Sequence, residues 1–509
     1  MTSGIYAYTP RMIGVLISAI VVCLVSWVYL RWRRVKQYWA ERGVPFLPPH
    51  PIFGSLTFLL KKNPGTWMIE MYQRFPKAPV IGIWLYWRPA LIINSPELAK
   101  RILLKDNYVF RDRFLSGGKH DPIGSLNILT TNDPLWAVVR RRITSIFTGS
   151  KLRALQPLVD TKSSQLITRI KNTEDYSKLN LRHLFADYAT DVFGTAAFGV
   201  ETHAVRTGED PMRAITEAFM TFDWLRGLGW SSIFFFPEMT KIFKFTLFPK
   251  WSTEYFKKIF AIVVEQRKDK VIKDPKDLVD ALLKMKQDGP VIDGVEITDD
   301  VVVSNAATML LGGFETSGSA LTFTLYHLAY EPEIQQKIYD EVSKAIGEDG
   351  KFDVSKLMEL TYLNAVVKET LRLYSPMGWL DRVASQDYQI DEKLTIKKGT
   401  PVYVNAIGMQ YDPDYFPEPL KYDPERFMPG NEKNIKPFTY LPFGEGPRIC
   451  IGMRFGLISV RHAISNLITK YKFEPIPGAP KPTEVEIEKK GLFFVPGQHM
   501  PINFIPRDV

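Results

Sequence analysis

The sequence predicts a mainly α-helical protein with a minor β part, built as a single large domain behind an N-terminal transmembrane helix. Three observations predict this fold class. An uncharged apolar run lies near the N-terminus, most of residues 134–347 has the pattern of long amphipathic helices, and short strands with Pro-, Asp- and Gly-rich loops follow Pro376. The 509 residues are long enough for about three average domains. We nevertheless find no repeat and no linker after residue 60 that would divide them.

The composition suits a globular body with a large core. Hydrophobic residues make up 45% of the chain and charged residues 24%, which excludes extensive disorder. The net charge of +10 fits nucleic acid, a membrane surface or an acidic partner protein. Only two cysteines occur, and Cys23 lies in the apolar run, so Cys450 is expected to be a free thiol in a reducing compartment.

The apolar run Met12–Leu30 predicts a membrane anchor. It contains no charged residue, and as a helix it would be about 28 Å long, close to the thickness of the hydrocarbon core. Arg11 precedes the run, whereas a denser basic flank (Arg31, Arg33, Arg34, Lys36) follows it. This asymmetry predicts a luminal N-terminus and a cytosolic body. A buried core helix is the alternative.

We expect three parts along the chain. Residues 1–36 are the anchor with its basic flank, residues 37–60 are a proline-rich hinge that holds the body off the bilayer, and residues 61–509 are the main domain. Within the main domain, residues 80–94 have a β-rich composition around a turn. Ser95 followed by Pro96 then predicts the start of a helix.

Residues 227–251 are unusually rich in aromatic side chains. Two interpretations are open: a segment folded onto the core, or a second membrane contact in which aromatic rings enter the interface and lysines meet headgroups. The residues concerned are Phe234, Phe235, Phe236, Phe243, Phe245 and Phe248, interleaved with Lys241, Lys244 and Lys250.

A long helix is predicted over residues 298–330, and its middle is poor in helix-forming residues. Gly312 and Gly313 each cost about 1 kcal/mol relative to alanine. Glycines in such a place are tolerated where a flat group approaches the backbone. Glu315 and Thr316 put an acid beside a hydroxyl at this point, which suits proton delivery. A packing notch with a hydrogen-bonded threonine is the alternative.

The free Cys450 lies in the string FGEGPRICIG, residues 443–452. No second cysteine and no histidine before His462 is near enough to complete a zinc or iron–sulfur site. A haem supplies its other ligands itself and needs one axial thiolate. Arg448 would pair with a haem propionate. Clearance for the macrocycle would come from Gly444, Gly446 and Gly452.

These residues resemble the cytochrome P-450 monooxygenases over essentially the whole chain. The haem-thiolate signature F-x-x-G-x-R-x-C-x-G is matched at Phe443, Gly446, Arg448, Cys450 and Gly452. Further family motifs follow in the family's order: W-x-x-x-R at Trp136 and Arg140, the oxygen-activating motif at residues 312–317, E-x-x-R at Glu369 and Arg372, and Arg426 of PERF. Arg382 is similar in position to another propionate ligand.

The resemblance implies a role for each of these residues. Cys450 is the axial ligand of haem b, while Glu315 and Thr316 deliver protons. The resemblance places the haem among Arg448, Trp136, Arg140, Arg382, Phe443, Gly444, Gly312 and Gly313, and makes Glu369, Arg372 and Arg426 a structural salt-bridge network. The implied substrate pocket includes Ile123, Leu126, Met377, Trp379, Phe493 and Phe494. Near it, Lys119, His120 and Asp121 are expected to face water or to orient a polar group.

The resemblance also implies a reaction and its partners. One oxygen of O2 enters a lipophilic substrate and the other leaves as water, with electrons from NADPH. Because we find no dinucleotide-binding fingerprint, a separate NADPH-cytochrome P-450 reductase is implied, with cytochrome b5 as a second possible donor. Basic residues expected either to attract that partner or simply to face solvent are Arg141, Arg142, Lys433, Lys436, Arg454 and Arg461.

The motif wording looks most like insect microsomal members that oxidise plant toxins and insecticides at the endoplasmic reticulum membrane. Endogenous lipids or hormones are other substrates to consider. An isomerase or dehydratase of the same fold needs no proton relay, so the Glu315–Thr316 pair argues against it. A non-catalytic haem-binding protein would not need the anchor, the basic residues and the relay together. Nucleic-acid binding has only the net charge in its favour.

Overall fold

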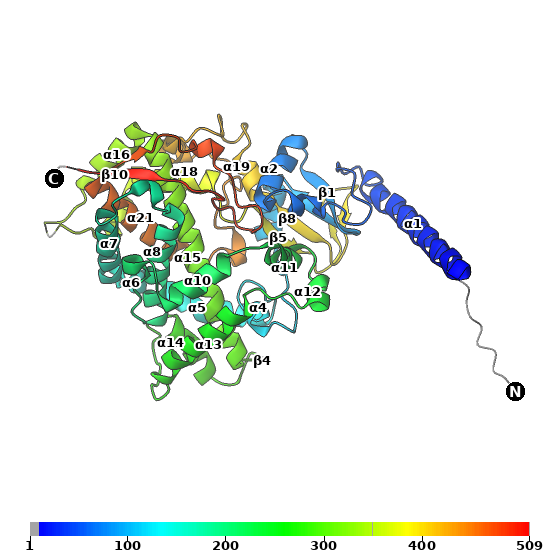
Figure 1. Ribbon diagram of the computed structural model, residues 1–509, viewed down its shortest axis with the longest axis horizontal. Coiled ribbons are helices and arrows are strands. Elements are labelled where there is room, and N and C mark those ends of the chain that lie inside the picture. Colours follow the sequence, from blue (N-terminus) through cyan, green and yellow to red (C-terminus); the bar gives the residue numbers. More distant parts are fainter. Residues whose placement is uncertain (1–9, 349, 508–509) are drawn as a thin grey trace.

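The computed structural model describes residues 10–348 and 350–507 and confirms a mainly helical body with small sheets. Figure 1 shows the helices filling most of the body, with the largest sheet at the end from which the anchor helix projects. The fold class expected from the sequence is therefore correct.

The largest sheet has four strands in the order β1-β2-β8-β5. Strands β1 (Val80–Leu85) and β2 (Arg88–Ile93) form the predicted antiparallel hairpin, with Val80 opposite Ile93. Strand β8 (Pro401–Val404) runs parallel to β2, and β5 (Leu380–Val383) runs antiparallel to β8. Two-stranded sheets join β9 (Tyr471–Pro475) with β10 (Ile502–Pro506), β3 (Val291–Ile292) with β4 (Val295–Glu296), and β6 (Tyr388–Gln389) with β7 (Thr395–Ile396).

The helix α15 (Asp299–Tyr330) passes through the centre of the body (Figure 1). Thr298 caps it by accepting a hydrogen bond from the Val301 amide at 3.3 Å. Most of its residues are buried on all sides, as its apolar composition predicts. The helices packed against it include α8 (Leu181–Phe198), α18 (Thr361–Leu373) and α21 (Met453–Lys470).

Other helices surround this core. The predicted start at Ser95 is confirmed, because its hydroxyl caps α3 (Pro96–Lys100) by accepting from the Leu98 amide. The longer members of this outer group are α2 (Pro64–Arg74), α5 (Leu135–Thr144), α7 (Gln156–Lys171), α10 (Pro211–Met220), α11 (Trp224–Phe235), α13 (Lys250–Glu265), α14 (Leu278–Gln287) and α16 (Pro332–Ser343).

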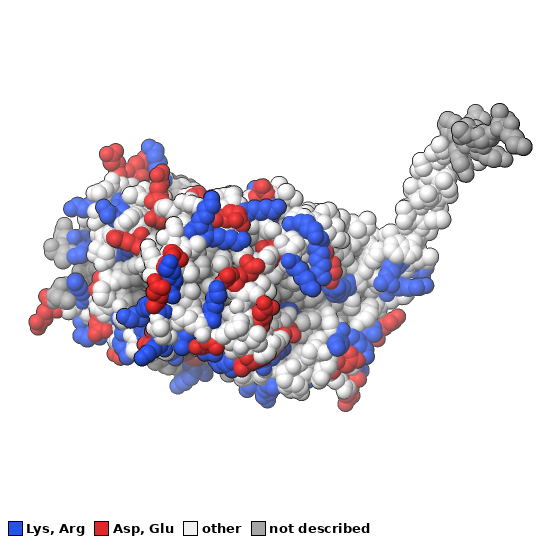
Figure 2. All heavy atoms as spheres, turned by 90° about the horizontal axis from the view of Figure 1, so that it is seen from below, with Lys and Arg blue, Asp and Glu red and all other residues white. Residues whose placement is uncertain are grey.

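The anchor helix α1 (Pro10–Ala40) continues without a break into the body. Its apolar part is exposed and long enough to cross a membrane. One side of its last turns packs on the body: Val35 and Trp39 are buried, the Trp39 indole donates to the Ile83 carbonyl at 3.1 Å, and the Trp32 indole donates to the Pro49 carbonyl at 2.9 Å. In Figure 2, basic side chains gather where the anchor meets the body. The N-terminal residues 1–9, expected on the luminal side, lie outside the described residues.

The proline-rich segment 37–60 lies on the sheet rather than standing between anchor and body. Phe46 forms a bridge with Gly82 of β1, and the Trp87 indole donates to the Pro51 carbonyl at 2.8 Å. Leu56 and Phe58 are buried in the main core. The prolines do favour extended backbone, but the apolar residues between them bind the segment to β1, so the spacer expected from the sequence needs correction.

The phenylalanine-rich segment is folded onto the core over most of its length, as the first interpretation expects, and its membrane contact stays a prediction. Its first rings, Phe234 and Phe235 at the end of α11, are buried in the core. In the following α12 (Glu238–Phe243), Ile242 and Phe243 are 67% and 62% exposed. One part of the segment therefore belongs to the core, and another presents apolar side chains outward.

Candidate active site

The Cys450 loop is closed by its own backbone. The Cys450 amide donates to the Phe443 carbonyl at 2.9 Å, which folds residues 443–450 back on themselves. Although the Cys450 side chain has accessible surface, it sits deep enough within the protein for desolvation to raise the pKa of its thiol. Hydrogen bonds from the Gly452 and Met453 amides, and the charge of Arg140, oppose this rise by favouring the thiolate.

Gly446 is required at its position by close packing. It has φ of +77°, and a Cβ placed there would lie 2.0 Å from the Leu103 carbonyl oxygen of the short π-helical turn Arg101–Lys105. The sequence interpretation, in which this glycine gives clearance to a macrocycle, is therefore corrected: Gly446 lets the cysteine loop pack on residues 101–105. A Cβ at Gly452, in contrast, would meet nothing within 4 Å.

Four arginines from separate segments form a cluster near the cysteine loop. Desolvation, together with repulsion from Arg113, lowers the pKa of both Arg382 and Arg448 to about 9. The same two effects lower the pKa of Arg140. The ion pairs that these arginines form are long, with 3.6 Å between Arg113 and Asp381 and 3.8 Å between Arg448 and Asp112.

This arginine cluster (Arg113, Arg140, Arg382, Arg448) fits the haem expected from the sequence. It holds more positive charge than the two aspartates neutralise, in an interior where unpaired charge is costly. The Arg113 Nε is buried without a hydrogen-bond partner among the described residues. Two propionates would supply the missing anionic oxygens, while Cys450 would supply a thiolate beside them.

Arg448 also fastens neighbouring segments together. Its Nε donates to the Arg111 carbonyl and its Nη1 to the Thr131 carbonyl, both at 3.1 Å, and the guanidinium lies 4.0 Å from the ring centre of Trp136. A third bond runs from Nη2 to the Asn132 side chain at 3.3 Å. Two of the five N–H groups of Arg448 therefore have no hydrogen-bond partner among the described residues. Trp136 and Arg140 lie about one turn apart on the same face of α5. Their binding to a haem propionate, which the family resemblance implies, stays a prediction.

Sequence reasoning did not identify Arg113. No motif contains it, and it stands in the basic string RDR together with Arg111. Its role arises because residues 111–114 cross the end of β5, where the Phe114 amide donates to Asp381 at 3.1 Å. The only signal in the sequence was a local concentration of basic residues before the predicted pocket.

The two glycines of α15 serve different neighbours. The Thr316 hydroxyl donates to the Gly312 carbonyl at 2.7 Å, and a Cβ at Gly312 would meet nothing within 4 Å. A Cβ at Gly313 would lie 2.2 Å from the Phe193 ring of α8. Gly312 is thus the glycine that leaves the helix surface open beside Thr316, and Gly313 lets α8 pack closely. A haem contact of either glycine stays a prediction.

Glu315 is held in an ion pair that the sequence did not indicate. Its Oε1 accepts from Arg182 Nη2 at 3.0 Å, from Arg182 Nε at 3.3 Å and from the Ser319 hydroxyl at 3.3 Å. Its neighbour Thr316 keeps accessible surface next to Gly312. The predicted acid and hydroxyl therefore lie side by side on α15, with the acid anchored to α8.

The residues predicted to line the substrate pocket come together around α15 and β5. The Ile123 carbonyl accepts from the Ser304 hydroxyl at 2.5 Å, and the Leu126 carbonyl accepts from Asn305 at 3.1 Å, so this segment is bound along α15. The Phe494 amide donates to the Pro376 carbonyl at 2.9 Å, which sets Phe493 and Phe494 beside the segment holding Met377. Their contact with substrate stays a prediction.

Trp379 and Asp121 differ from the other pocket candidates. Trp379 is almost fully buried, and its ring packs 5.5 Å from that of Phe235. Asp121 is buried too: it accepts from the amides of Gly124 at 2.9 Å and Leu247 at 2.8 Å, and burial raises the pKa of its carboxyl. The expectation that it faces water is wrong, because it joins the 116–125 segment to residues 245–247.

The basic residues expected to attract an electron donor are not equally accessible. Arg461 is buried, donates to the Met358 sulfur, and its pKa is lowered to about 10 by desolvation, so it is removed from this set. Ion pairs with acids occupy Arg141, Arg142 and Lys436. Lys433 and Arg454 are exposed.

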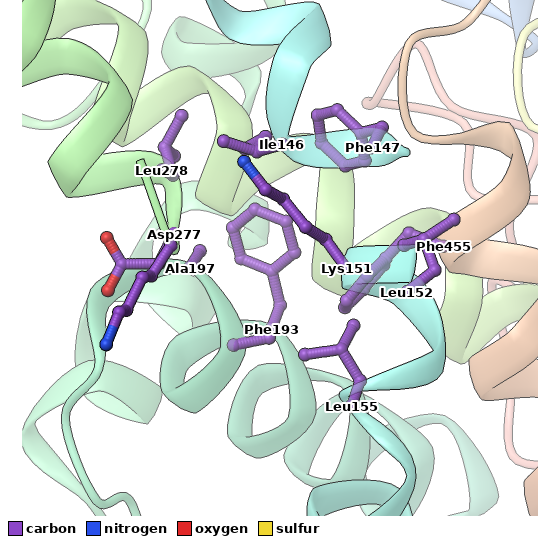
Figure 3. Close-up of a pocket in the computed structure, with 12 residues that line it drawn as sticks. Ile146, Phe147, Lys151, Leu152, Leu155, Phe193, Ala197, Asp277, Leu278 and Phe455 are labelled. Carbon is purple, nitrogen blue, oxygen red and sulfur yellow. The ribbon is translucent and has the colours of Figure 1, made fainter. Parts of the chain in front are cut away.

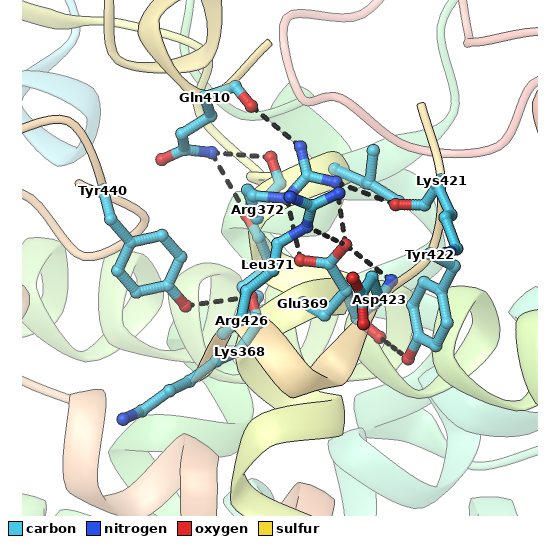
Figure 4. A network of polar contacts seen from close by, with 12 residues as sticks. Lys368, Glu369, Leu371, Arg372, Gln410, Lys421, Tyr422, Asp423, Arg426 and Tyr440 are labelled. Atoms are coloured by element: carbon cyan, nitrogen blue, oxygen red, sulfur yellow. Dashed lines mark hydrogen bonds and ion pairs between the residues drawn. The ribbon is translucent and has the colours of Figure 1, made fainter. Parts of the chain in front are cut away.

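The predicted structural network is present and largely buried (Figure 4). Arg372 donates in a fork to Glu369, with Nε to Oε2 at 2.7 Å and Nη2 to Oε1 at 2.8 Å, and both side chains are fully buried. Arg372 also donates to the Gln410 carbonyl at 2.8 Å, and Arg426 approaches Glu369 to 3.5 Å. The network ties α18 to the loops that lead to the cysteine loop.

A separate pocket is lined by residues of α8, among them Phe193 and Ala197, and by residues of neighbouring segments (Figure 3). Phe193 and Phe455 contribute to its apolar wall, their ring centres 5.5 Å apart. Its charged members are Lys151, Lys276 and Asp277. None of the residues predicted for catalysis or for haem binding lines it.

Comparisons with known proteins agree with the resemblance. The family model described as Cytochrome P450 matches residues 44–500. Cytochrome P450 6k1 of Blattella germanica is 33% identical to this chain, over 96% of each. Cytochrome P450 6B7 of Helicoverpa armigera is 30% identical over 97% of this chain and 99% of its own. Probable cytochrome P450 6g2 of Drosophila melanogaster is 31% identical over 89% and 91%.

Proposed function

The chain belongs to the cytochrome P450 family of haem monooxygenases, and we propose that it oxidises lipophilic foreign compounds at the endoplasmic reticulum membrane. Electrons would come from NADPH through a separate reductase, with cytochrome b5 as a further donor. The observation that carries the proposal is the surplus of buried arginine charge beside the free thiol of Cys450.

Each group of residues in the candidate active site has a separate proposed role. The haem, when bound, supplies the activation of O2. Cys450 would bind the iron, and the Gly452 and Met453 amides would stabilise the negative charge of its sulfur. The arginine cluster would hold the propionates of the cofactor. Thr316, beside the open surface at Gly312, and Glu315, next to it in the chain and paired with Arg182, would hold and pass protons.

The substrate class is inferred from the apolar side chains near α15 and β5. Phe493, Phe494 and Ile123 offer no charged group to a ligand, which favours a lipophilic molecule. The similarity to insect proteins supports plant toxins and insecticides as the first class to test. Endogenous lipids or hormones form the second class.

Reconstitution tests this proposal directly. The full-length protein, purified in detergent and supplied with NADPH and a microsomal reductase, is expected to convert at least one member of a panel of lipophilic toxins into a product that carries one oxygen from ¹⁸O2. Isomerised or dehydrated products that require no NADPH would favour the same-fold isomerase instead.

Removing the Thr316 hydroxyl is expected to separate NADPH use from product formation. In Thr316→Val, the product formed per NADPH should fall about tenfold or more while hydrogen peroxide rises, because the shape is kept and the proton donor is lost. Thr308→Val is the matched control on α15, since the Thr308 hydroxyl is buried and has no hydrogen-bond partner in the part of the chain that the structure describes. Unchanged coupling in Thr316→Val would remove this residue from the relay.

We further propose how the protein sits on the membrane. The anchor α1 crosses the bilayer once and the body faces the cytosol, in keeping with the basic flank after residue 30. The exposed Ile242 and Phe243 of α12, with Trp224 and Leu225 of α11, form a second contact with lipid. Binding to phosphatidylcholine vesicles by a protein lacking residues 1–26 tests this contact, and Phe243→Glu should weaken it.

A further inference from the structure

We infer that Arg182 is a positioning residue that couples Glu315 to the C-terminal hairpin, defined here as residues 486–497, so that movement of the hairpin alters proton delivery. The inference rests on the proposed function, because it assigns Glu315 to the proton relay. It adds a residue outside every motif in the sequence and a link between the relay and a segment distant in the chain.

Arg182 is held firmly at the start of α8. Asn180 caps that helix by accepting from the His183 amide at 3.2 Å, which fixes the turn that carries Arg182. The Arg182 side chain is 23% exposed, and that of Glu315 is 4% exposed. A charge-assisted pair with this degree of burial is stronger than a surface ion pair, and it fixes the direction of both side chains.

The bonds to Glu315 all fall on one carboxylate oxygen. Two come from Arg182 and the third from Ser319, and each ends at Oε1. Within the described residues Oε2 accepts no hydrogen bond. It is not fully buried and retains accessible surface. Arg182 therefore fixes the carboxylate through Oε1 and leaves Oε2 free to exchange a proton.

The same guanidinium reaches the C-terminal hairpin with its remaining nitrogen. Arg182 Nη1 donates to the Pro496 carbonyl at 3.3 Å. The hairpin is closed by bonds from the Glu488 amide to the Val495 carbonyl at 3.0 Å and from the Gly497 amide to the Glu486 carbonyl at 2.7 Å. It carries Phe493 and Phe494, both predicted to contact substrate.

Hydrogen bonds from outside the hairpin are found near its tip and at Phe494, whose amide donates to the Pro376 carbonyl at 2.9 Å, whereas within the described residues Pro496 is bound by Arg182. Asn63 donates to the carbonyls of Glu488, Gly491 and Phe493, at 2.9, 3.2 and 3.0 Å. The Arg182 bond lies at the other end of the strand that contains Phe494. A substrate that displaces this strand would pull on Nη1, and because the guanidinium is rigid, the same motion would shift the two nitrogens bound to Glu315.

A structural role for Arg182, as a clamp between α8 and α15, would predict only a loss of stability. The chain offers a matched control for this case. Arg169 forms an ion pair with Asp187 of α8 at 2.6 Å, with side chains 23% and 3% exposed, and it touches neither α15 nor the hairpin in any hydrogen bond. Arg169→Gln therefore removes a pair of equal burial without touching the relay.

The experiment compares Arg182→Gln, Arg182→Lys and Arg169→Gln as haem-loaded, full-length proteins with reductase and the panel compound that the unaltered enzyme oxidises fastest. In Arg182→Gln we expect product per NADPH to fall at least fivefold, with a larger solvent deuterium isotope effect on product formation. Independently of turnover, hydrogen exchange at the Glu488 and Gly497 amides should become several-fold faster. Arg182→Lys keeps the charge but cannot make both contacts, so hairpin exchange should also be faster in that variant.

Each contrary result has one meaning. Unchanged coupling or unchanged hairpin exchange in Arg182→Gln overturns the inference, as does an equal effect of Arg169→Gln on both measurements. If Arg182→Gln does not fold, Arg182→Lys decides by the same two measurements. Failure of the proposed function is distinct, because the unaltered enzyme would then oxidise no panel compound.

Discussion

Replacing Cys450 with alanine is expected to abolish the far-red-shifted Soret band that the reduced protein gives with carbon monoxide. That band requires a thiolate on the iron, and Cys450 is the thiol beside the arginine cluster. Monooxygenase activity should disappear with the band, because electron donation from sulfur favours cleavage of the O–O bond. Difference spectroscopy of the purified protein measures the effect.

The control for this substitution is the other cysteine. Cys23 lies in the exposed apolar part of α1, so Cys23→Ala should leave the spectrum and the activity as they are. Haem binding through the arginine cluster alone should survive in Cys450→Ala to some degree, which separates loss of the ligand from loss of the fold. A Soret band in Cys450→Ala identical to that of the unaltered protein would refute axial ligation by this residue.

Removing the charge of Glu369 is expected to have the largest effect on stability. Glu369→Gln leaves the guanidinium of Arg372 buried without its anionic partner, and breaking such a pair costs about 3–5 kcal/mol of the free energy of unfolding. The cost is high because both side chains are fully buried and water cannot replace the lost contact. The shift of the urea midpoint of the haem-loaded protein measures it.

A surface pair between Lys368 of α18 and Glu432 provides the comparison. Lys368 contacts Glu432 at 2.5 Å, with both side chains partly exposed, so Glu432→Gln should change the free energy of unfolding by no more than about 1 kcal/mol. The two substitutions remove the same chemical group from partners next to each other on α18. Equal effects would show that burial of the Glu369–Arg372 pair does not determine its contribution.

Features fixed by neighbours in the chain were predictable from the sequence. The caps at Ser95 and Thr298, the apolar run of α1 and the hairpin of β1 and β2 each follow from residues within a few positions. The motif residues Trp136 and Arg140 could be placed on one face for the same reason. Local spacing was enough because a helix or a hairpin sets these distances by itself.

Features that depend on which distant segments meet were not predictable. Arg113 enters the arginine cluster only because its loop crosses β5, and Arg182 meets Glu315 only because α8 packs along α15. Gly446 looked like a clearance glycine, but the backbone that it touches belongs to Leu103. Asp121 looked exposed in a polar string, yet the Leu247 amide covers it. In each case the partner residue lies far away in the sequence, and no sequence pattern indicates the contact.

The unbroken course of α1 into the core has a mechanical consequence. Since the Trp39 indole is bonded to β1 and the Trp32 indole to the Pro49 carbonyl, the last turns of the helix are fixed to the body, and helix and body rotate as one lever about the point where the chain enters the bilayer. Transmembrane helices tilt until their apolar length matches the thickness of the surrounding membrane. The angle at which the body meets the membrane surface is therefore tied to bilayer thickness, and a thicker membrane holds the lever more upright.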